Sequence, residues 1–387
     1  MNIAKNSKFN IDINYRKSHG SYIFDNKTSR EYLDFFGMYA SLPLGYNHEI
    51  FQTEKYKKAI LETSAFKVNN CEFVSEYSSK FDQDFTEYAS RGKFKHFHYC
   101  CTGALAVEAA IKTSLQYKSF HPLKVLSYNN SFHGINSYSG FITSRFWPVT
   151  SKLDGLPDSF SLKIEPDLEA TKKALENNDI TCILVEPIQC SVGDIHLNKE
   201  FLNGLRELAD DYDVPLIFDE IQIGFGGTGK LWFYEHLDIV PDIVVFGKKT
   251  QLSGIMAKEK FSDIFKKENI TRLEVTWNSD VVDMVRCSYI IEAYKNFSIL
   301  ENVKKTGSYM LRSLKNNECI QNVRGQGMII AFDLESSNKR DQLVKDLFNN
   351  GLLCNPTGKK SIRLRPNLAL TKTDAEKAIE KIKYLGK

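Results

Sequence analysis

Two apolar runs that end in charged residues stand in the middle of this sequence: Leu216-Ile217-Phe218-Asp219-Glu220-Ile221-Gln222 and Asp242-Ile243-Val244-Val245-Phe246-Gly247-Lys248-Lys249-Thr250-Gln251. Short continuous runs rich in β-branched and aromatic residues are typical of strands that are buried on both faces. The sequence therefore predicts two buried strands, one followed by Asp219 and the other by Lys248.

Three further runs of the same kind precede this pair: Phe97-His98-Tyr99-Cys100, Lys124-Val125-Leu126-Ser127-Tyr128 and Cys182-Ile183-Leu184-Val185. In residues 199–212, apolar side chains recur at steps of three and four, as one face of a helix requires. Strands that alternate with helices predict an α/β fold with a mostly parallel sheet covered by helices. Ligands of such sheets bind beyond the carboxyl ends of the strands, where Asp219 and Lys248 fall.

The length of 387 residues favours two domains, and the C-terminal third changes in character. Strand-like and helix-like stretches there predict a small α+β domain; they are 325–334, 339–349, 361–366 and a final helix after Thr371. Strand-like residues 21–25 and 32–35 are expected to pack against it. The predicted division is an N-terminal segment 1–50, a large cofactor-binding domain 51–285 and a small domain 286–387.

Composition narrows the class of protein. A net charge of +3, from 51 basic and 48 acidic residues, is too small to indicate a nucleic-acid-binding protein. No run approaches about 18 apolar residues and the first residues lack a signal-peptide core, so we expect a soluble cytoplasmic protein without a membrane partner. The eight cysteines show no CxxC pair or zinc-like spacing, which predicts neither a disulfide nor a bound metal.

Asp219 and Lys248 are the two residue types that pyridoxal 5'-phosphate (PLP) requires of a protein, because an acid keeps the pyridinium nitrogen protonated and a lysine forms an imine. Either residue alone is ordinary at a strand end, as a cap or a solvated loop residue. Two other motifs favour the cofactor. Thr102-Gly103-Ala104 opens an Ala-rich helix whose first amides could bind a phosphate. Phe132-His133-Gly134 offers an aromatic ring to stack on the pyridine ring.

In order and spacing, six motifs resemble those of the class III aminotransferases of fold type I: Thr102-Gly103-Ala104, Phe132-His133-Gly134, Val185-Glu186-Pro187-Ile188-Gln189, Phe218-Asp219-Glu220-Ile221-Gln222, Phe246-Gly247-Lys248 and Thr276. Within that class, residues 104–108, 247–251 and 282–286 most resemble lysine 6-aminotransferase. The resemblance runs from about Tyr22 to the C-terminus. It implies a PLP-dependent transaminase with a two-domain, homodimeric fold.

The resemblance also implies roles for single residues. Lys248 would be the Schiff-base lysine, with Lys249 a bystander, and Asp219 would pair with the pyridinium nitrogen. The other cofactor contacts would come from Thr102, Gly103, Ala104, Phe132 over the ring, His133, Ile221 under the ring, Gln222 at the phenolic oxygen, and Thr276 of the partner subunit at the phosphate.

Substrate residues are where the chain departs from its family. Arg363 stands where the family holds the α-carboxylate of the keto acid with a bidentate guanidinium. Ile135 stands where lysine 6-aminotransferases carry an Arg for the α-carboxylate of lysine. Ser191 stands where many relatives carry a Glu that masks the keto-acid arginine. These two replacements predict that free lysine is not the substrate.

Three functions are compatible with this pattern. The first is an aminotransferase that moves an amino group between an amine or amino acid, lysine-like or another ω-amine, and 2-oxoglutarate or glutamate. The second is a PLP-dependent racemase, epimerase or decarboxylase on the same fold. The third is a non-catalytic homologue, which the joint retention of Lys248, Asp219, Phe132 and Thr276 disfavours. Arg363 favours transamination.

Overall fold

The computed structural model describes residues 9–119, 124–144, 159–270 and 273–386. Its largest sheet has seven strands in the order β3-β11-β10-β9-β6-β4-β5. Their bounds are β3 (His96–Cys100), β4 (Lys124–Tyr128), β5 (Ser161–Ile164), β6 (Ile180–Val185), β9 (Leu216–Asp219), β10 (Ile243–Phe246) and β11 (Ser253–Ala257). Every pairing is parallel except those of β11, which runs antiparallel to both neighbours. The five predicted strands and the mostly parallel sheet are confirmed.

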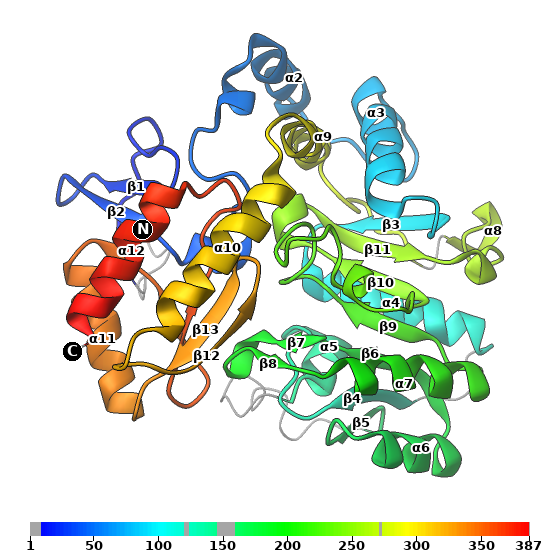
Figure 1. The fold of residues 1–387 in the computed structure, drawn as a ribbon. Helices are drawn as coiled ribbons and strands as arrows, with labels where there is room; N and C mark the ends of the chain where they lie inside the picture. Colours follow the sequence, from blue (N-terminus) through cyan, green and yellow to red (C-terminus); the bar gives the residue numbers. More distant parts are fainter. Residues whose placement is uncertain (1–8, 120–123, 145–158, 271–272, 387) are drawn as a thin grey trace.

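Helices cover both faces of this sheet, as Figure 1 shows. They include α4 (Gly103–Tyr117), α5 (Ser137–Ile142), α6 (Leu168–Asn177) and α7 (Lys199–Asp211), the last close to its predicted bounds. Successive residues of a strand point to opposite faces, and β9 follows this rule. Phe218 belongs to the same apolar cluster as Leu205 of α7, whereas Ile217 belongs to the cluster that contains Val107 of α4. Burial on both faces explains why the strands are continuous apolar runs.

A second, four-stranded antiparallel sheet has the order β12-β13-β16-β15. Its strands are β12 (Gln321–Gln326), β13 (Ile329–Asp333), β15 (Asn355–Thr357) and β16 (Ser361–Leu364), and its neighbouring helices are α10 (Ile299–Lys315), α11 (Ser337–Asn349) and α12 (Lys372–Leu385). The apolar run 325–334 is split by a tight turn at Gly327, which has a φ of 60°. In Figure 1 these elements lie to the left of the seven-stranded sheet.

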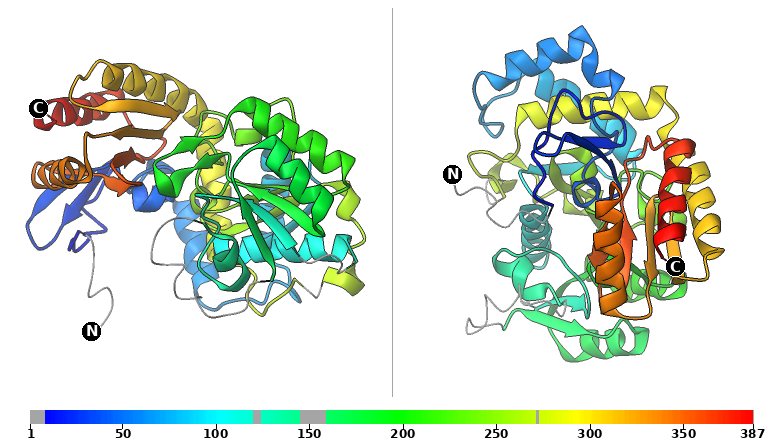
Figure 2. Two further views of the ribbon diagram at one scale, coloured as in Figure 1. Left: turned by 90° about the horizontal axis from the view of Figure 1, so that it is seen from below. Right: turned by 90° about the vertical axis from the view of Figure 1, so that its left-hand side faces the viewer.

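The N-terminal strands β1 (Tyr22–Asp25) and β2 (Arg30–Asp34) join β14 (Leu352–Leu353) in a third sheet, so these N-terminal strands lie beside the C-terminal part of the chain (Figure 2). The Tyr22 hydroxyl donates to Asp374 of α12 at 2.5 Å. The predicted boundary at residue 285 falls within α9 (Val281–Asn296), the long helix on which α2 (Glu54–Ser64) and α3 (Glu76–Phe85) pack. The domain boundaries themselves stay a prediction.

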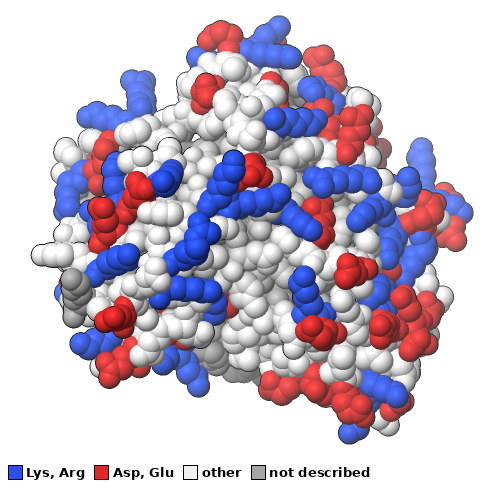
Figure 3. Space-filling view, in the orientation of Figure 1, with Lys and Arg blue, Asp and Glu red and all other residues white. Residues whose placement is uncertain are grey.

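Short elements complete the described part of the chain: α1 (Gly37–Ala40), η1 (Glu49–Gln52), η2 (Thr86–Ser90), β7 (Ile188–Gln189), η4 (Cys190–Val192), β8 (Ile195–His196), η5 (Phe233–His236), η6 (Lys248–Thr250), η7 (Glu259–Phe261) and α8 (Lys267–Ile270). None of the helices in the described ranges combines the length and apolar character needed to span a membrane. The face in Figure 3 mixes basic and acidic side chains, with basic ones gathered over α10. Location in the cytoplasm stays a prediction.

Candidate active site

A cavity of about 490 Å³ opens at the carboxyl ends of the central strands, within the size range of small-molecule sites. It is lined by residues from six chain segments: Ser41, Cys101, Thr102, Gly103, Ala104, Phe132, His133, Gly134, Ile135, Glu186, Asp219, Ile221, Gln222, Lys248, Gln251, Leu252 and Ser253. Every predicted cofactor residue except Thr276 is therefore brought to one place. Of the predicted substrate residues, Ile135 lines the cavity, whereas Ser191 and Arg363 lie outside its lining.

The sheet register explains why Asp219 and Lys248 meet. β9 and β10 are parallel neighbours, and Val245 lies opposite Asp219. Asp219 is the last residue of β9, and Lys248 follows the end of β10 after one glycine. Because both strands end at the same edge of the sheet, their next side chains share the space beyond it.

The Asp219 carboxylate is held by two groups. Its Oδ2 lies 2.8 Å from Nδ1 of His133, and its Oδ1 accepts the backbone N–H of Ile221 at 3.1 Å. The His133 side chain is fully buried and Asp219 is 5% exposed. Since a carboxylate only accepts, the His133 proton sits on Nδ1. The carboxylate therefore cannot rotate away from the cavity without breaking two hydrogen bonds.

Glu186 is a buried acid to which the sequence analysis gave no role of its own. It is the residue directly after β6, as Asp219 and Lys248 lie at the ends of β9 and β10. This place at a strand end is the sequence signal that could have identified Glu186. Its Oε2 accepts the backbone N–H of Phe132 at 2.7 Å, which fixes the aromatic residue at the cavity wall. Burial, and then the charge of Asp219, raise the pKa of Glu186 well above its ordinary value. The uncharged acid is thereby favoured.

Lys248 and Lys249 differ in their surroundings. Lys248 lines the cavity, with a left-handed backbone (φ 56°) that turns it out of the strand direction. Burial lowers the pKa of Lys248 to about 8, and the nearby Arg363 guanidinium also lowers it. Lys249 is 3% exposed and its Nζ donates to the backbone carbonyl of Gln222 at 2.5 Å. Lys248 is therefore the lysine available to a ligand.

The start of α4 forms one wall of the cavity. Thr102 is the residue before the helix, and its side chain makes no capping bond to the first turn. The first amides of a helix have no partner within it, so those of Gly103 and Ala104 are suited to an anion. Gly103 packs tightly, because a Cβ there would lie 2.9 Å from Cδ1 of Ile221. Any larger residue would displace Ile221.

Arg363 lies on β16 and is 7% exposed. Its Nη1 donates to the carbonyl of Cys190 at 2.9 Å, and its guanidinium lies 5.9 Å from the ring centre of Tyr39. Ser191, in the adjoining 3-10 turn η4, brings no charge to it. Arg365, the other arginine of this strand end, is 1% exposed and paired with Asp194 at 2.5 Å.

Thr276 lies apart from the cavity of its own chain. It is exposed, in the loop that precedes α9. The Sγ of Cys101, a cavity residue, donates to the carbonyl of the next residue, Trp277, at 2.9 Å. The loop therefore lies near the mouth of the cavity on the outer surface, and Thr276 is not among its lining residues.

Several lining residues were missed by sequence reasoning besides Glu186. They are Ser41, Cys101, Gln251, Leu252 and Ser253. Gln251 stands in the quoted motif, and its side-chain amide donates to the carbonyl of Ser41. Ser41 carries no signal in the sequence, because only the folded chain brings the N-terminal segment to the loop after Lys248.

The residues that line the cavity fit PLP. Lys248 can reach the cavity, Asp219 is a fixed acid beside it, and the first amides of α4 suit a phosphate. The Nε2 of His133 is buried without a protein partner in the described structure. Across the described ranges, no group of three or more His, Cys, Asp or Glu side chains is arranged to hold a metal ion.

Comparison with known proteins agrees with this geometry. The family model for class III aminotransferases matches residues 3–385. An L-lysine-epsilon aminotransferase from Mycobacterium bovis is 31% identical, over 96% of this chain and 91% of that protein. A 4-aminobutyrate aminotransferase from Kluyveromyces lactis is 28% identical, over 94% of this chain and 87% of that protein. A solved structure of a lysine aminotransferase from M. tuberculosis has a TM-score of 0.92 and 30% identity, and covers 98% of this chain and 95% of that one.

The family model matches nearly the whole chain, and one relative is more than 30% identical to it. The cavity presents Lys248 and Asp219 together, as this family requires. The chain belongs to the class III aminotransferases, PLP-dependent enzymes that transfer an amino group between an amine and a keto acid.

Proposed function

We propose that this aminotransferase takes its amino group from an amine that lacks a carboxylate at its far end, and that glutamate and 2-oxoglutarate form the other substrate pair. The observation that carries the proposal is the placement of charge. Arg363 is a buried cation close enough to influence Lys248, whereas Ile135 lines the cavity without any charge. The carboxylate of a keto acid then has Arg363 as a cation to bind. A carboxylate at the far end of the amine substrate would find no cation at residue 135.

Lys248 would carry out the chemistry of both half-reactions. Bound PLP supplies an aldehyde and an electron-withdrawing ring. The Nζ of Lys248 would bind the cofactor covalently and, when free, would move a proton at the substrate carbon. A pKa lowered to about 8 by burial suits this role, because much of the amine is neutral near that pH.

The other residues would orient the cofactor and exclude water. Asp219, held by His133, would face the pyridinium nitrogen and keep it charged. Phe132 and Ile221 would pack on the two faces of the ring, and Gln222 would meet the phenolic oxygen. Thr102, Gly103 and Ala104 would hold the phosphate with Thr276 of the partner subunit. The enzyme would accordingly be a homodimer, and we expect it in the cytoplasm.

The substrate class follows from Ile135 and Ser191. Ile135 is 60% exposed, so an α-carboxylate of lysine placed beside it would meet an apolar side chain and solvent. The relatives are named for lysine and for 4-aminobutyrate, both ω-amines. We therefore propose an ω-amine whose other end is uncharged or apolar. With Ser191 in place of an acid, Arg363 would stay open to keto acids without a masking carboxylate.

The first test is the glutamate half-reaction. Purified protein loaded with PLP is mixed with L-glutamate, and the visible spectrum is followed while 2-oxoglutarate is measured. We expect stoichiometric 2-oxoglutarate and pyridoxamine phosphate. Arg363→Ala should slow this half-reaction by about one to two orders of magnitude, because a charge-assisted bond to a carboxylate is lost. Arg312→Ala, on the exposed side of α10, is the control and should behave as wild type.

Other products would contradict the proposal. Formation of D-glutamate or of 4-aminobutyrate without pyridoxamine phosphate would indicate a racemase or a decarboxylase instead. Full activity of Arg363→Ala would show that another group binds the keto acid.

A further inference from the structure

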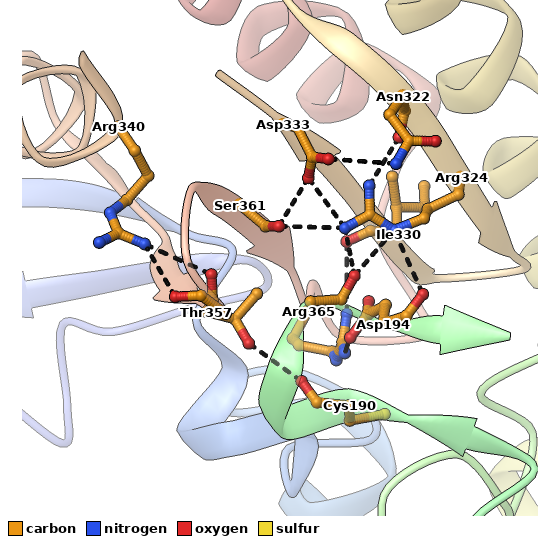
Figure 4. Close-up of polar contacts among 12 residues, drawn as sticks. Cys190, Asp194, Asn322, Arg324, Ile330, Asp333, Arg340, Thr357, Ser361 and Arg365 are labelled. Carbon is orange, nitrogen blue, oxygen red and sulfur yellow. Dashed lines mark hydrogen bonds and ion pairs between the residues drawn. The ribbon is translucent and has the colours of Figure 1, made fainter. Parts of the chain in front are cut away.

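Arg365 makes contacts that extend from the second sheet to the cavity. It follows β16 and is 1% exposed. Its Nη2 donates to Oδ1 of Asp194 at 2.5 Å, and its Nη1 donates to the carbonyls of Leu364 and Ile330 at 3.0 and 3.3 Å. Figure 4 shows Arg365 beside Asp194 in this network. Its Nε donates to Oε1 of Gln222 at 3.2 Å.

This last contact determines which way the Gln222 amide faces. The two ends of a glutamine amide have nearly the same shape, so the group can be turned over unless its partners differ. An arginine side chain has donors and no acceptor. Arg365 can therefore bind only the carbonyl end of the amide, and the NH₂ end is left for the cavity that Gln222 lines.

The backbone of Gln222 is fixed as well. Its carbonyl accepts the Nζ of Lys249 at 2.5 Å, and Gln222 is only 9% exposed. With the main chain held by Lys249 and the side-chain oxygen held by Arg365, the amide has little freedom. A turned amide would place NH₂ against the guanidinium, which is a contact between two donors.

We propose that Arg365 is a positioning residue, which orients Gln222 so that its amide NH₂ faces the cavity as a hydrogen-bond donor. An anionic oxygen, such as the phenolic oxygen of bound PLP, is the ligand atom that such a donor stabilises. The inference rests on the proposed role of Gln222 at the cofactor. Arg365 itself touches neither substrate nor cofactor and acts through Gln222.

The test uses the visible absorption band of the holoenzyme, titrated with pH. A donor at the phenolic oxygen competes with the proton shared between that oxygen and the neighbouring imine, so losing the donor should move the titration midpoint upward. Arg365→Lys keeps the charge beside Asp194 and leaves Lys248 and Lys249 in place, but removes Nε. We expect an upward shift of about 0.5 to 1 pH unit, the size expected for one hydrogen bond.

Two further variants separate orientation from general disturbance. Gln222→Leu should shift the midpoint in the same direction, and the double variant with Arg365→Lys should shift it no further, because both changes remove one interaction. Arg324→Lys is the matched control. Arg324 donates to the carbonyls of Gly193 and Asp194 at 2.8 and 3.2 Å. It makes no hydrogen bond to Gln222 within the described structure, so Arg324→Lys should leave the midpoint unchanged.

Each outcome separates the hypotheses. Additive shifts of Arg365→Lys and Gln222→Leu, or an unchanged midpoint in Arg365→Lys, would overturn the role of Arg365 and leave the proposed function standing. An equal shift in Arg324→Lys would assign the effect to movement of the 193–194 segment, and would also overturn it. A wild-type protein that gives no visible band with PLP would remove the proposed function and this inference together.

Discussion

Lys248 and Lys249 are adjacent in sequence, yet only one of them is free to react. Lys249 is buried and its Nζ donates to the Gln222 carbonyl, whereas Lys248 lines the cavity next to Asp219. The left-handed backbone at Lys248 separates the two side chains. At the scale of single residues, the choice of nucleophile is therefore made by hydrogen bonding and backbone direction and not by residue type.

Borohydride reduction tests this choice. Reduction should fix PLP to Lys248, and peptide mass spectrometry should find the label there. Lys248→Ala should bind PLP through the phosphate site but carry no label and lose turnover. Lys249→Met is the matched control and should still be labelled at Lys248. A label on Lys249 in wild type would contradict the assignment.

The pKa of Lys248 predicts how cofactor capture depends on pH. Burial disfavours the charged amine and lowers its pKa to about 8, so the amine is mostly neutral above pH 8 and mostly protonated below it. Only the neutral amine attacks an aldehyde. The rate at which apoprotein captures PLP should rise with pH and level off above about 8, falling about tenfold per unit below the midpoint. Stopped-flow absorbance measures this rate; a rise that continues to pH 10 would indicate a solvated lysine.

At the scale of elements, the sequence could predict the part of the site that lies at the ends of neighbouring parallel strands. Runs buried on both faces identified β9 and β10, and their shared edge placed Asp219 and Lys248 together. β11 was missed because Ser253 and Gly254 break its apolar run, although it is fully buried. Sequence periodicity holds no information about such a reversed strand.

Contacts between the sheets could not be predicted. Arg365 and Gln222 are separated by 143 positions, and Arg363 and Cys190 by 173. Their meeting depends on how β16 docks beside the segment after β6, which local patterns do not specify. The family resemblance suggested what Arg363 does, but the link from Arg365 to Gln222 came only from the folded chain.

The loop before α5 offers a test of specificity. Ile135 lies there, exposed at the cavity, so a longer side chain can be added without filling the core. Ile135→Arg should raise kcat/KM for L-lysine by about one to two orders of magnitude, because it restores a charge-assisted bond to the α-carboxylate. Ile135→Met adds length without charge and should not. If wild type already uses lysine as well as glutamate, another cation binds that carboxylate and the interpretation of Ile135 is wrong.

At the scale of the whole molecule, large apolar side chains are exposed near the Thr276 loop. Val275 and Trp277 flank Thr276 and are 53% and 52% exposed, and Phe73 and Val74 are 67% and 85% exposed. The loops that carry residues 73–74 and 275–277 are in contact, because the Sγ of Cys71 donates to the carbonyl of Val275. Exposed apolar residues that gather in this way are typical of interaction surfaces. They support the proposal that this face meets a second copy, which would deliver Thr276 to the neighbouring phosphate site.

Mixed dimers test that proposal. A protomer with Lys248→Ala retains Thr276, and a protomer with Thr276→Ala retains Lys248. In a mixed dimer one site has lost both residues, while the other takes Lys248 from one chain and Thr276 from its partner and is intact. Random reassociation makes about half of the dimers mixed, so activity should return to about a quarter of wild type. Each parent alone should fall below this value, and mixing without subunit exchange is the control. Recovery would show that the site is shared between subunits, whereas full activity in a demonstrated monomer, or no gain after proven exchange, would place Thr276 outside the active site.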